Sequence, residues 1–146
     1  MIGSSAVGVR VVGLMVEVSA RMNAIELALN RVPQIDGMVD AVLVEASTGL
    51  VVGELGTEDR DGPASAVLAA AATDLVHTIS LLTAQQAGAG PFHELIVTLR
   101  DQHHLVRPVQ GPGLDSLFLL VTLDRRRANL ALARHQMQAF ESQIVA

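Results

Sequence analysis

The chain has 146 residues, of which 50% are hydrophobic and 17% charged, and its formal net charge is −5. This length is typical of one domain, and the high apolar content predicts a folded core, not a disordered segment. Cysteine is absent, which excludes disulfides and thiolate sites and mildly favours a cytoplasmic location. The acidic charge, with three Phe and no Trp or Tyr, argues against nucleic-acid binding, which needs a basic field and stacking side chains.

The first 17 residues are an apolar segment that precedes the recognisable elements. Its start has no basic residue, and Arg10 and Glu17 interrupt the apolar run, so it does not have the pattern of a signal peptide. No stretch reaches the roughly 20 consecutive apolar residues that span a bilayer, and we expect no membrane insertion. We expect residues 1–17 to be an N-terminal extension, and residues 18–146 to be one domain that folds without it.

Hydrophobic periodicity predicts a helix and then a β-hairpin. Apolar residues recur at three- to four-residue spacing over residues 19–32, and Pro33 ends this helix. Residues 38–46 and 50–55 are rich in β-branched side chains, which favours two strands. Gly49, in the short segment between them, supplies the positive φ that a tight turn needs. Strands joined by so short a turn must pair antiparallel.

A long helix is predicted over residues 63–86, because Pro63 suits a first helical turn and a Gly-rich segment follows. Its apolar residues form a stripe at helical spacing, which we expect to face the core: Val67, Leu68, Ala71, Leu75, Ile79 and Leu82. A run of alanines at residues 69–72 makes one flank smooth enough for a neighbouring helix or sheet to approach closely.

Three strands and a final helix are predicted in the second half of the chain, over residues 92–100, 104–109, 116–123 and 128–145. The third of these strands is apolar on both faces, as expected of a central strand that is covered on each side. Pro108 cannot donate a ladder hydrogen bond, so we expect it at the end of its strand or at a bulge. Tight turns join the strands, and the element order predicts a single α+β domain.

Residues that catalyse reactions or bind metals form no recognised pattern. His103 ends a predicted turn and His104 begins the next predicted strand, and since adjacent strand residues point to opposite faces, the pair cannot easily share a metal. No serine lies in a Gly-x-Ser-x-Gly turn, and residues 88–91 lack the Lys-Ser/Thr of a phosphate loop. We therefore expect no enzyme activity, no metal and no cofactor, and the chain itself is not expected to be a GTPase.

Three consecutive arginines, Arg125, Arg126 and Arg127, precede the final helix. Positive charge near a helix N-terminus opposes the helix dipole, by about 0.3–1 kcal/mol for each exposed charge. We expect Asp124 to offset part of this cost as the N-cap. Two interpretations stay open: a solvated surface, which is the usual meaning of a charge run, and a contact with an acidic or nucleotide-loaded partner.

Several segments, taken together, carry a family resemblance. Residues 29–37 (LNRVPQIDG) end a helix in a Pro- and Gly-containing turn, and residues 39–44 (VDAVLV) form the strand that follows. Residues 48–52 (TGLVV) lead into the second strand, and the alanine-rich helix and an LFLLVTL strand come later. With these segments, the chain from about Met22 to Ile144 resembles the Roadblock/LC7 family, in particular its bacterial regulators of small GTPases.

The resemblance implies an α+β, profilin-like layout. Its five-stranded antiparallel sheet has the order 2-1-5-4-3, with the long helix on one face and the two terminal helices on the other. It also implies a cytoplasmic, non-catalytic module that forms a homodimer by pairing third strands and middle helices. Such modules regulate or scaffold a small Ras-like GTPase in bacterial signalling. On the third strand, the implied dimer interface is Leu95, Ile96, Val97, Thr98 and Leu99.

The paired long helices of such a dimer would form one composite surface for the partner GTPase. The polar positions of this helix that lie away from its apolar stripe are expected to face that partner: Asp74, His77, Thr78 and Gln85. A small-molecule sensor domain of PAS or GAF type is the alternative function. Such a domain needs a concave pocket with a few convergent polar groups, whereas the expected interior here is almost entirely aliphatic.

Overall fold

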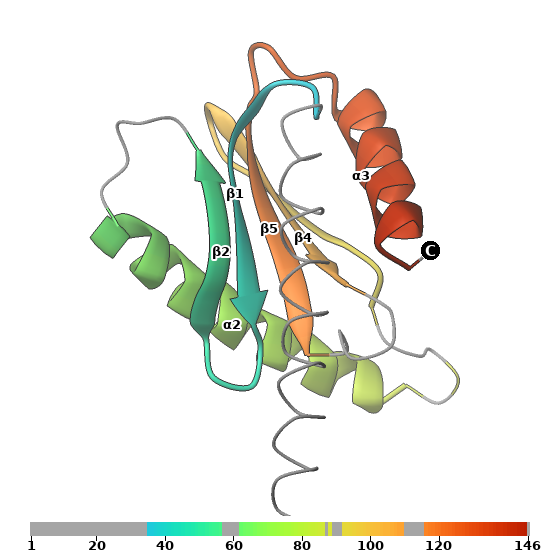
Figure 1. The fold of residues 1–146 in the computed structure, drawn as a ribbon. Coiled ribbons are helices and arrows are strands. Elements are labelled where there is room, and N and C mark those ends of the chain that lie inside the picture. Colours follow the sequence, from blue (N-terminus) through green and yellow to red (C-terminus); the bar gives the residue numbers. More distant parts are fainter. Residues whose placement is uncertain (1–34, 57–61, 87, 89–91, 110–115, 146) are drawn as a thin grey trace, which may run out of the picture.

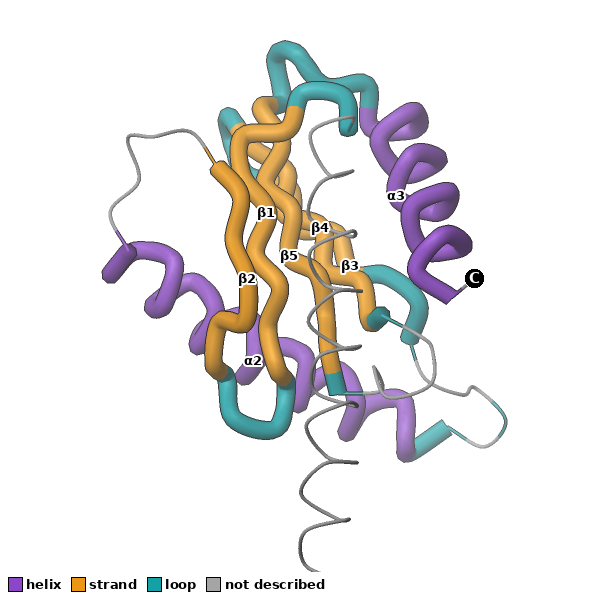
Figure 2. The backbone as a smooth tube through the Cα atoms, in the orientation of Figure 1, coloured by secondary structure: helices purple, strands orange, loops and turns teal. Residues whose placement is uncertain are grey.

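The computed structural model describes residues 35–56, 62–86, 88, 92–109 and 116–145 (Figures 1 and 2). The elements are β1 (Met38–Glu45), β2 (Leu50–Gly56), α2 (Gly62–Ala84), β3 (Leu95–Thr98), β4 (Gln102–Pro108), β5 (Leu117–Asp124) and α3 (Leu130–Val145). The predicted helix over residues 19–32 and the N-terminal extension lie outside the described residues.

The five strands form one antiparallel sheet of order β2-β1-β5-β4-β3, which confirms the predicted order (Figure 1). The turn between β1 and β2 contains Gly49 with φ of 75°, as its tight geometry requires. Pro108 is the last residue of β4, as expected of a residue that has no amide hydrogen to donate. β2 and β3 are the two edges of the sheet.

The β3–β4 hairpin differs from the prediction in the position of its turn. β3 is shorter than the predicted strand over residues 92–100, so Leu99 lies in the turn. Its amide donates a hydrogen bond of 2.8 Å to the carbonyl of Gln102, which closes the hairpin. β4 consequently begins earlier than predicted, and His103 pairs with Thr98. The prediction that His103 lies in a turn is therefore wrong.

The start of α3 also differs from the prediction. The helix begins at Leu130, two residues later than expected, because Asn129 is its N-cap. The Oδ1 of Asn129 accepts a hydrogen bond of 3.1 Å from the amide of Leu132. Asp124, which we expected to be the cap, accepts a hydrogen bond from the amide of Arg126 at 2.9 Å instead. Its carboxylate therefore orders the connection before the helix.

The side chains of β5 alternate between two core layers on the two faces of the sheet. The first layer joins β5 to α3 and includes Leu117, Leu119, Val121, Leu123, Ala133 and Met137. The second joins β5 to α2 and includes Phe118, Leu120, Ala69, Ala72 and Val76. α2 and α3 therefore lie on opposite faces, as Figure 1 also shows. β5 is buried on both faces, as its apolar sequence predicts.

The turn before β1 approaches the start of α3 very closely. Gly37 has φ of 70°, and a Cβ placed on it would lie 2.5 Å from the Cβ of Ala128. The carbonyl of Gly37 accepts a hydrogen bond of 2.9 Å from the amide of Asp124. The carboxylate of Asp36 accepts one of 2.6 Å from the amide of Asn129. This contact fixes α3 relative to the sheet and leaves no space for a side chain at Gly37.

We predict that Gly37→Ala lowers the free energy of unfolding by more than about 3 kcal/mol, because a left-handed backbone and a steric clash add together. Gly88→Ala is the matched control, since Gly88 has φ of 80° but no atom within 4 Å of its added Cβ. The control should lose only about 1–2 kcal/mol, the cost of the left-handed conformation. Urea unfolding measures both values. Equal losses would show that the contact with Ala128 is not close.

Candidate interaction surface

α2 packs on the sheet through its small side chains and presents its larger apolar side chains to solvent. Ala69, Ala72 and Val76 are buried against the sheet. The larger apolar side chains that are exposed are Val67 (71%), Leu75 (37%), Leu81 (68%) and Leu82 (58%). Most of these follow the spacing of one helix face, together with the exposed Ala71. We call Val67, Ala71, Leu75 and Leu82 the outer stripe of α2.

The prediction that the apolar stripe of this helix faces the core is wrong for the four residues of the outer stripe, whereas Leu68 packs against the core and Ile79 is half-buried. Both faces of this helix are apolar, so periodicity alone favours the one with the larger side chains. The structure selects the alanine flank because small side chains let the helix approach the β1–β2 hairpin closely. There, a Cβ on Gly49 would lie 3.6 Å from the Oγ1 of Thr73, and the Nε2 of His77 lies 3.0 Å from the carbonyl oxygen of Ala46.

Segment Ala66–Ala84 of α2 is long and apolar enough, by length and composition, to cross a membrane, and no other described helix is. Only 22% of its apolar window is buried within the domain. A helix that packs on its own sheet can meet the same criterion, and the buried alanines show that α2 packs in this way. The small buried fraction reflects the outer stripe, which nothing in the described part of the chain covers.

The four polar residues that were expected to face a partner are all exposed, but they fall into two groups. Thr78 and Gln85 follow the three- to four-residue spacing of the outer stripe and lie within it. Asp74, three residues after Ala71 and four before Thr78, directly borders the stripe. His77 lies farther round the helix, where its ring is held against the β1–β2 turn by its hydrogen bond to Ala46. A surface that covered the outer stripe would thus bury the first group and leave the second at its rim.

β3 is an open edge of the sheet, and one of its side chains faces the core layer that contains α2. Leu95 packs against the core layer that contains α2, whereas Ile96 packs against the α3 layer. Val97 is half-buried, Thr98 is exposed, and Leu99, beyond the end of the strand, is 47% exposed. Unpaired backbone groups on an apolar edge favour association with another chain. We call the outer stripe and β3 together the α2–β3 surface.

The two adjacent histidines of β4 have structural hydrogen bonds on opposite faces of the sheet. The Nδ1 of His103 lies 3.0 Å from the Oγ1 of Thr98, and the Nδ1 of His104 lies 3.0 Å from the Oγ1 of Thr122. The expectation that the pair points in opposite directions is confirmed by the strand geometry. Among the described residues, no group of three or more His, Asp or Glu side chains could hold a metal ion.

One buried ion-pair network was not predicted from the sequence. Glu94, just before β3, has its Oε2 3.3 Å from an Nη1 of Arg107 and its Oε1 2.6 Å from the Nε of Arg134. The side chains of Glu94 and Arg107 are only 11% and 8% exposed. Removing one member of such a buried pair leaves the other uncompensated. The network therefore ties the start of the edge strand to β4 and α3.

The orientation of α2 makes a testable distinction between neighbouring alanines. We predict that Ala69→Leu lowers the free energy of unfolding by about 1–3 kcal/mol, because the added atoms overpack the contact with the sheet. Ala71→Leu should change it by less than about 0.5 kcal/mol in the monomer, since Ala71 is exposed. Thermal and urea unfolding measure both. A larger loss for Ala71→Leu would mean that the outer stripe faces the sheet.

Comparisons with known proteins support the fold. No protein-family model and no curated protein matches the sequence. The Roadblock/LC7 domain from Streptomyces avermitilis is similar with a TM-score of 0.67 and 18% identity, over 81% of this chain and 92% of that one. Myxococcus xanthus MglB gives 0.70 and 18%, over 84% and 86%. A structure of MglB with a tetrameric arrangement gives 0.68 and 16%, over 86% and 88%.

Proposed function

We propose that this chain, which has a Roadblock/LC7-type fold, is a non-catalytic interaction module that forms a homodimer through the α2–β3 surface. The observation that carries the proposal is the outer stripe of α2. Its Val67 and Leu82 side chains are more than half exposed on a helix whose opposite face is already packed on the sheet. Contiguous apolar surface of this kind marks an interaction site in soluble proteins.

A second copy of the chain satisfies both parts of this surface at once. Antiparallel pairing of two β3 strands about a two-fold axis would saturate the unpaired backbone groups of both edges. The same axis would bring two α2 helices together, so that each outer stripe is covered by the other. Leu95 of β3 packs against the core layer beneath α2, and on this proposal the strand and the helix contribute to one interface. The tetrameric arrangement of the related MglB structure is consistent with self-association of this fold.

We predict that the wild-type protein is a dimer at about 10–50 µM, and that Leu75→Glu with Leu82→Glu weakens dimerisation at least 100-fold. The cause is the burial of two unpaired carboxylates in an apolar interface. Leu132→Glu is the matched control, because Leu132 is exposed to a similar degree on α3, on the opposite face. Light scattering measures the molar mass.

The control variant should remain dimeric. A monomeric wild-type protein, or a double variant that stays dimeric, would contradict the proposal. A monomeric wild type that sediments with phosphatidylcholine vesicles would indicate that a membrane surface covers the outer stripe instead.

We further infer that the partner of this dimer is a small Ras-like GTPase in a bacterial, cytoplasmic signalling system. The fold and the sequence resemblance to bacterial GTPase regulators support this inference. The two-fold axis would place two copies of Asp74 and His77 at the rim of the paired helices, which gives a composite polar surface that a monomer lacks. Thr78 and Gln85, within the stripe, belong on this proposal to the dimer contact and not to the partner surface.

We predict that Asp74→Arg combined with His77→Ala weakens GTPase binding about tenfold and leaves the dimer intact, because both residues lie outside the stripe. The probe is a purified bacterial Ras-like small GTPase, loaded with a non-hydrolysable GTP analogue. Titration calorimetry measures the affinity. Loss of binding in Arg126→Glu, with normal binding of the Asp74/His77 variant, would place the GTPase on the arginines before α3 and overturn the docking surface.

The alternative of a small-molecule sensor gains no support from the buried polar groups. Thr73 donates a hydrogen bond to the carbonyl of Ala69 at 2.7 Å. Thr122 and His103 have side-chain partners within the sheet, and Arg107 is paired with Glu94. These groups are occupied by contacts inside the domain, whereas a ligand site needs polar groups that converge on a cavity.

A further inference from the structure

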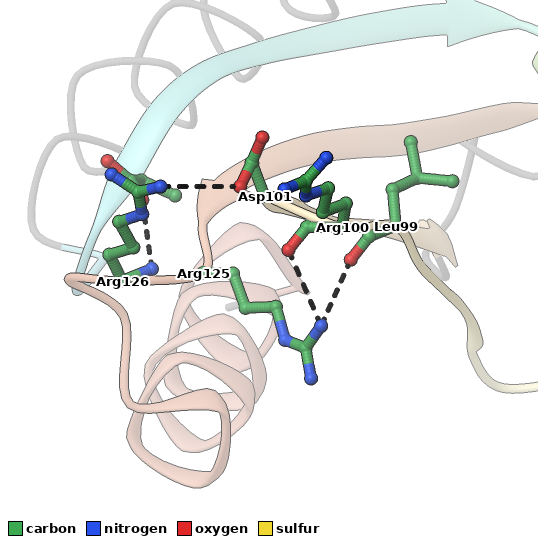
Figure 3. Close-up of polar contacts among 6 residues, drawn as sticks. Leu99, Arg100, Asp101, Arg125 and Arg126 are labelled. Carbon is green, nitrogen blue, oxygen red and sulfur yellow. Dashed lines mark hydrogen bonds and ion pairs between the residues drawn. The ribbon is translucent and has the colours of Figure 1, made fainter.

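Arginines from two separate loops gather at one end of the sheet, and Figure 3 shows Arg100, Arg125 and Arg126 among them. Arg100 comes from the β3–β4 turn, and Arg125, Arg126 and Arg127 come from the connection between β5 and α3. All four are exposed, and they are four of the ten basic residues in a chain whose net charge is −5. We call these four residues the arginine platform. Folding buries none of them.

The two loops that carry the platform are tied together through the backbone. The amide of Arg125 donates a hydrogen bond of 3.0 Å to the carbonyl of Asp101. An Nη1 of Arg125 also lies between the carbonyl oxygens of Leu99 and Arg100, at 3.3 and 3.4 Å (Figure 3). These three hydrogen bonds join segments that are about 25 residues apart in the sequence. They fix the spacing between the two loops in the unbound protein.

The arginines of the platform have different roles. Arg125 is engaged with backbone carbonyls, and the Nε of Arg127 is held by the carboxylate of Asp124 at 3.1 Å. Hydrogen bonds from the Arg126 amide and the Arg127 side chain lower the pKa of Asp124 and keep it charged. In the described part of the chain, the guanidinium of Arg126 has a single ion pair, a long one of 3.7 Å with Asp101, and the two side chains are 82% and 63% exposed.

An exposed ion pair of this length contributes about 0–1 kcal/mol, so the guanidinium of Arg126 can exchange Asp101 for another anion at little cost. Arg100 lies on the neighbouring turn and is exposed to solvent. The two guanidinium groups that a partner can reach most readily are therefore those of Arg100 and Arg126. The contacts of Arg125 and Arg127 hold the two loops that carry them in place.

We propose that the arginine platform binds an acidic segment of a partner protein, with Arg100 and Arg126 as the residues that contact its carboxylates. A guanidinium group binds a carboxylate through two parallel hydrogen bonds, which favours arginine over lysine at such a site. The platform contains no residue of the outer stripe, although Arg100 lies two residues beyond the end of β3, and the inference does not depend on the proposed dimer.

The chemistry of the platform favours a protein over a membrane or a nucleic acid. Asp101 and Asp124 are interspersed among the arginines, so the surface presents both signs of charge at short range. Binding to anionic lipid or to nucleic-acid phosphates depends on an unopposed basic field, and the net charge of −5 repels both polyanions. A protein segment with carboxylates opposite the arginines is less affected by this repulsion, because its binding depends on short-range pairs of opposite charge.

The test uses the full chain and a fluorescein-labelled peptide of about twelve residues that alternates Glu and Gly, measured by fluorescence anisotropy at low ionic strength. Arg100→Gln with Arg126→Gln should weaken binding at least tenfold. Arg100→Lys with Arg126→Lys keeps the charge but loses the paired hydrogen bonds, and should weaken binding about threefold or more. The melting temperature should not change, because neither side chain is buried.

Ala84→Glu with Ala139→Glu is the charge-matched control, since both residues are exposed outside the platform and the outer stripe. It changes the net charge by the same amount and should leave peptide affinity within about twofold. Equal peptide binding by the wild type and the Arg100/Arg126 variant would overturn the proposal. Wild-type protein that does not bind the peptide would also overturn it. So would wild-type protein that binds phosphatidylserine-containing vesicles or an oligo-dT strand more tightly than it binds the peptide.

Discussion

The structure depends on the close packing of small α2 side chains against the sheet. Ala69 and Ala72 allow the helix to contact the β1–β2 hairpin, and the Nε2 of His77 lies 3.0 Å from the carbonyl oxygen of Ala46 in the turn of that hairpin. A helix can pack only one face against its own sheet. Because α2 packs its alanine face, the side chains of Val67, Leu75 and Leu82 are exposed to solvent. The packing of α2 thus leaves these side chains exposed in the described part of the chain, and β3 is an open edge of the sheet.

The local pattern of the sequence was sufficient for most of the fold. β-Branched runs and the turn at Gly49 place the β1–β2 hairpin, and the two-sided apolar run of β5 marks the central strand. The orientation of α2 was not predictable by the same means. The helix has two apolar faces, and hydrophobic periodicity does not distinguish which of them packs on the sheet. The length of β3 was overestimated because an edge strand ends where its one neighbour stops pairing, whatever its own propensity.

The candidate surfaces were predictable only in part. The edge position of Leu95–Thr98 and the exposure of Asp74 and His77 follow from the predicted topology. The contacts of charged residues do not, because Glu94, Arg107 and Arg134 are far apart in the sequence and meet only in the folded chain. The arginine platform is similar: the run Arg125–Arg127 is visible in the sequence, but its association with Arg100 depends on the β3–β4 turn lying beside the α3 connection.

The central claim is that two outer stripes face each other, and the absence of cysteine allows a direct measurement. A single cysteine at Thr78, within the stripe, should form an intermolecular disulfide under mild oxidation, because only sulfurs brought within bonding distance can pair. A cysteine at the exposed Ala131, on α3, should remain reduced under the same conditions. Efficient cross-linking at position 78 alone, seen on a non-reducing gel, is the predicted result. Cross-linking at position 131 without cross-linking at position 78 would contradict the account.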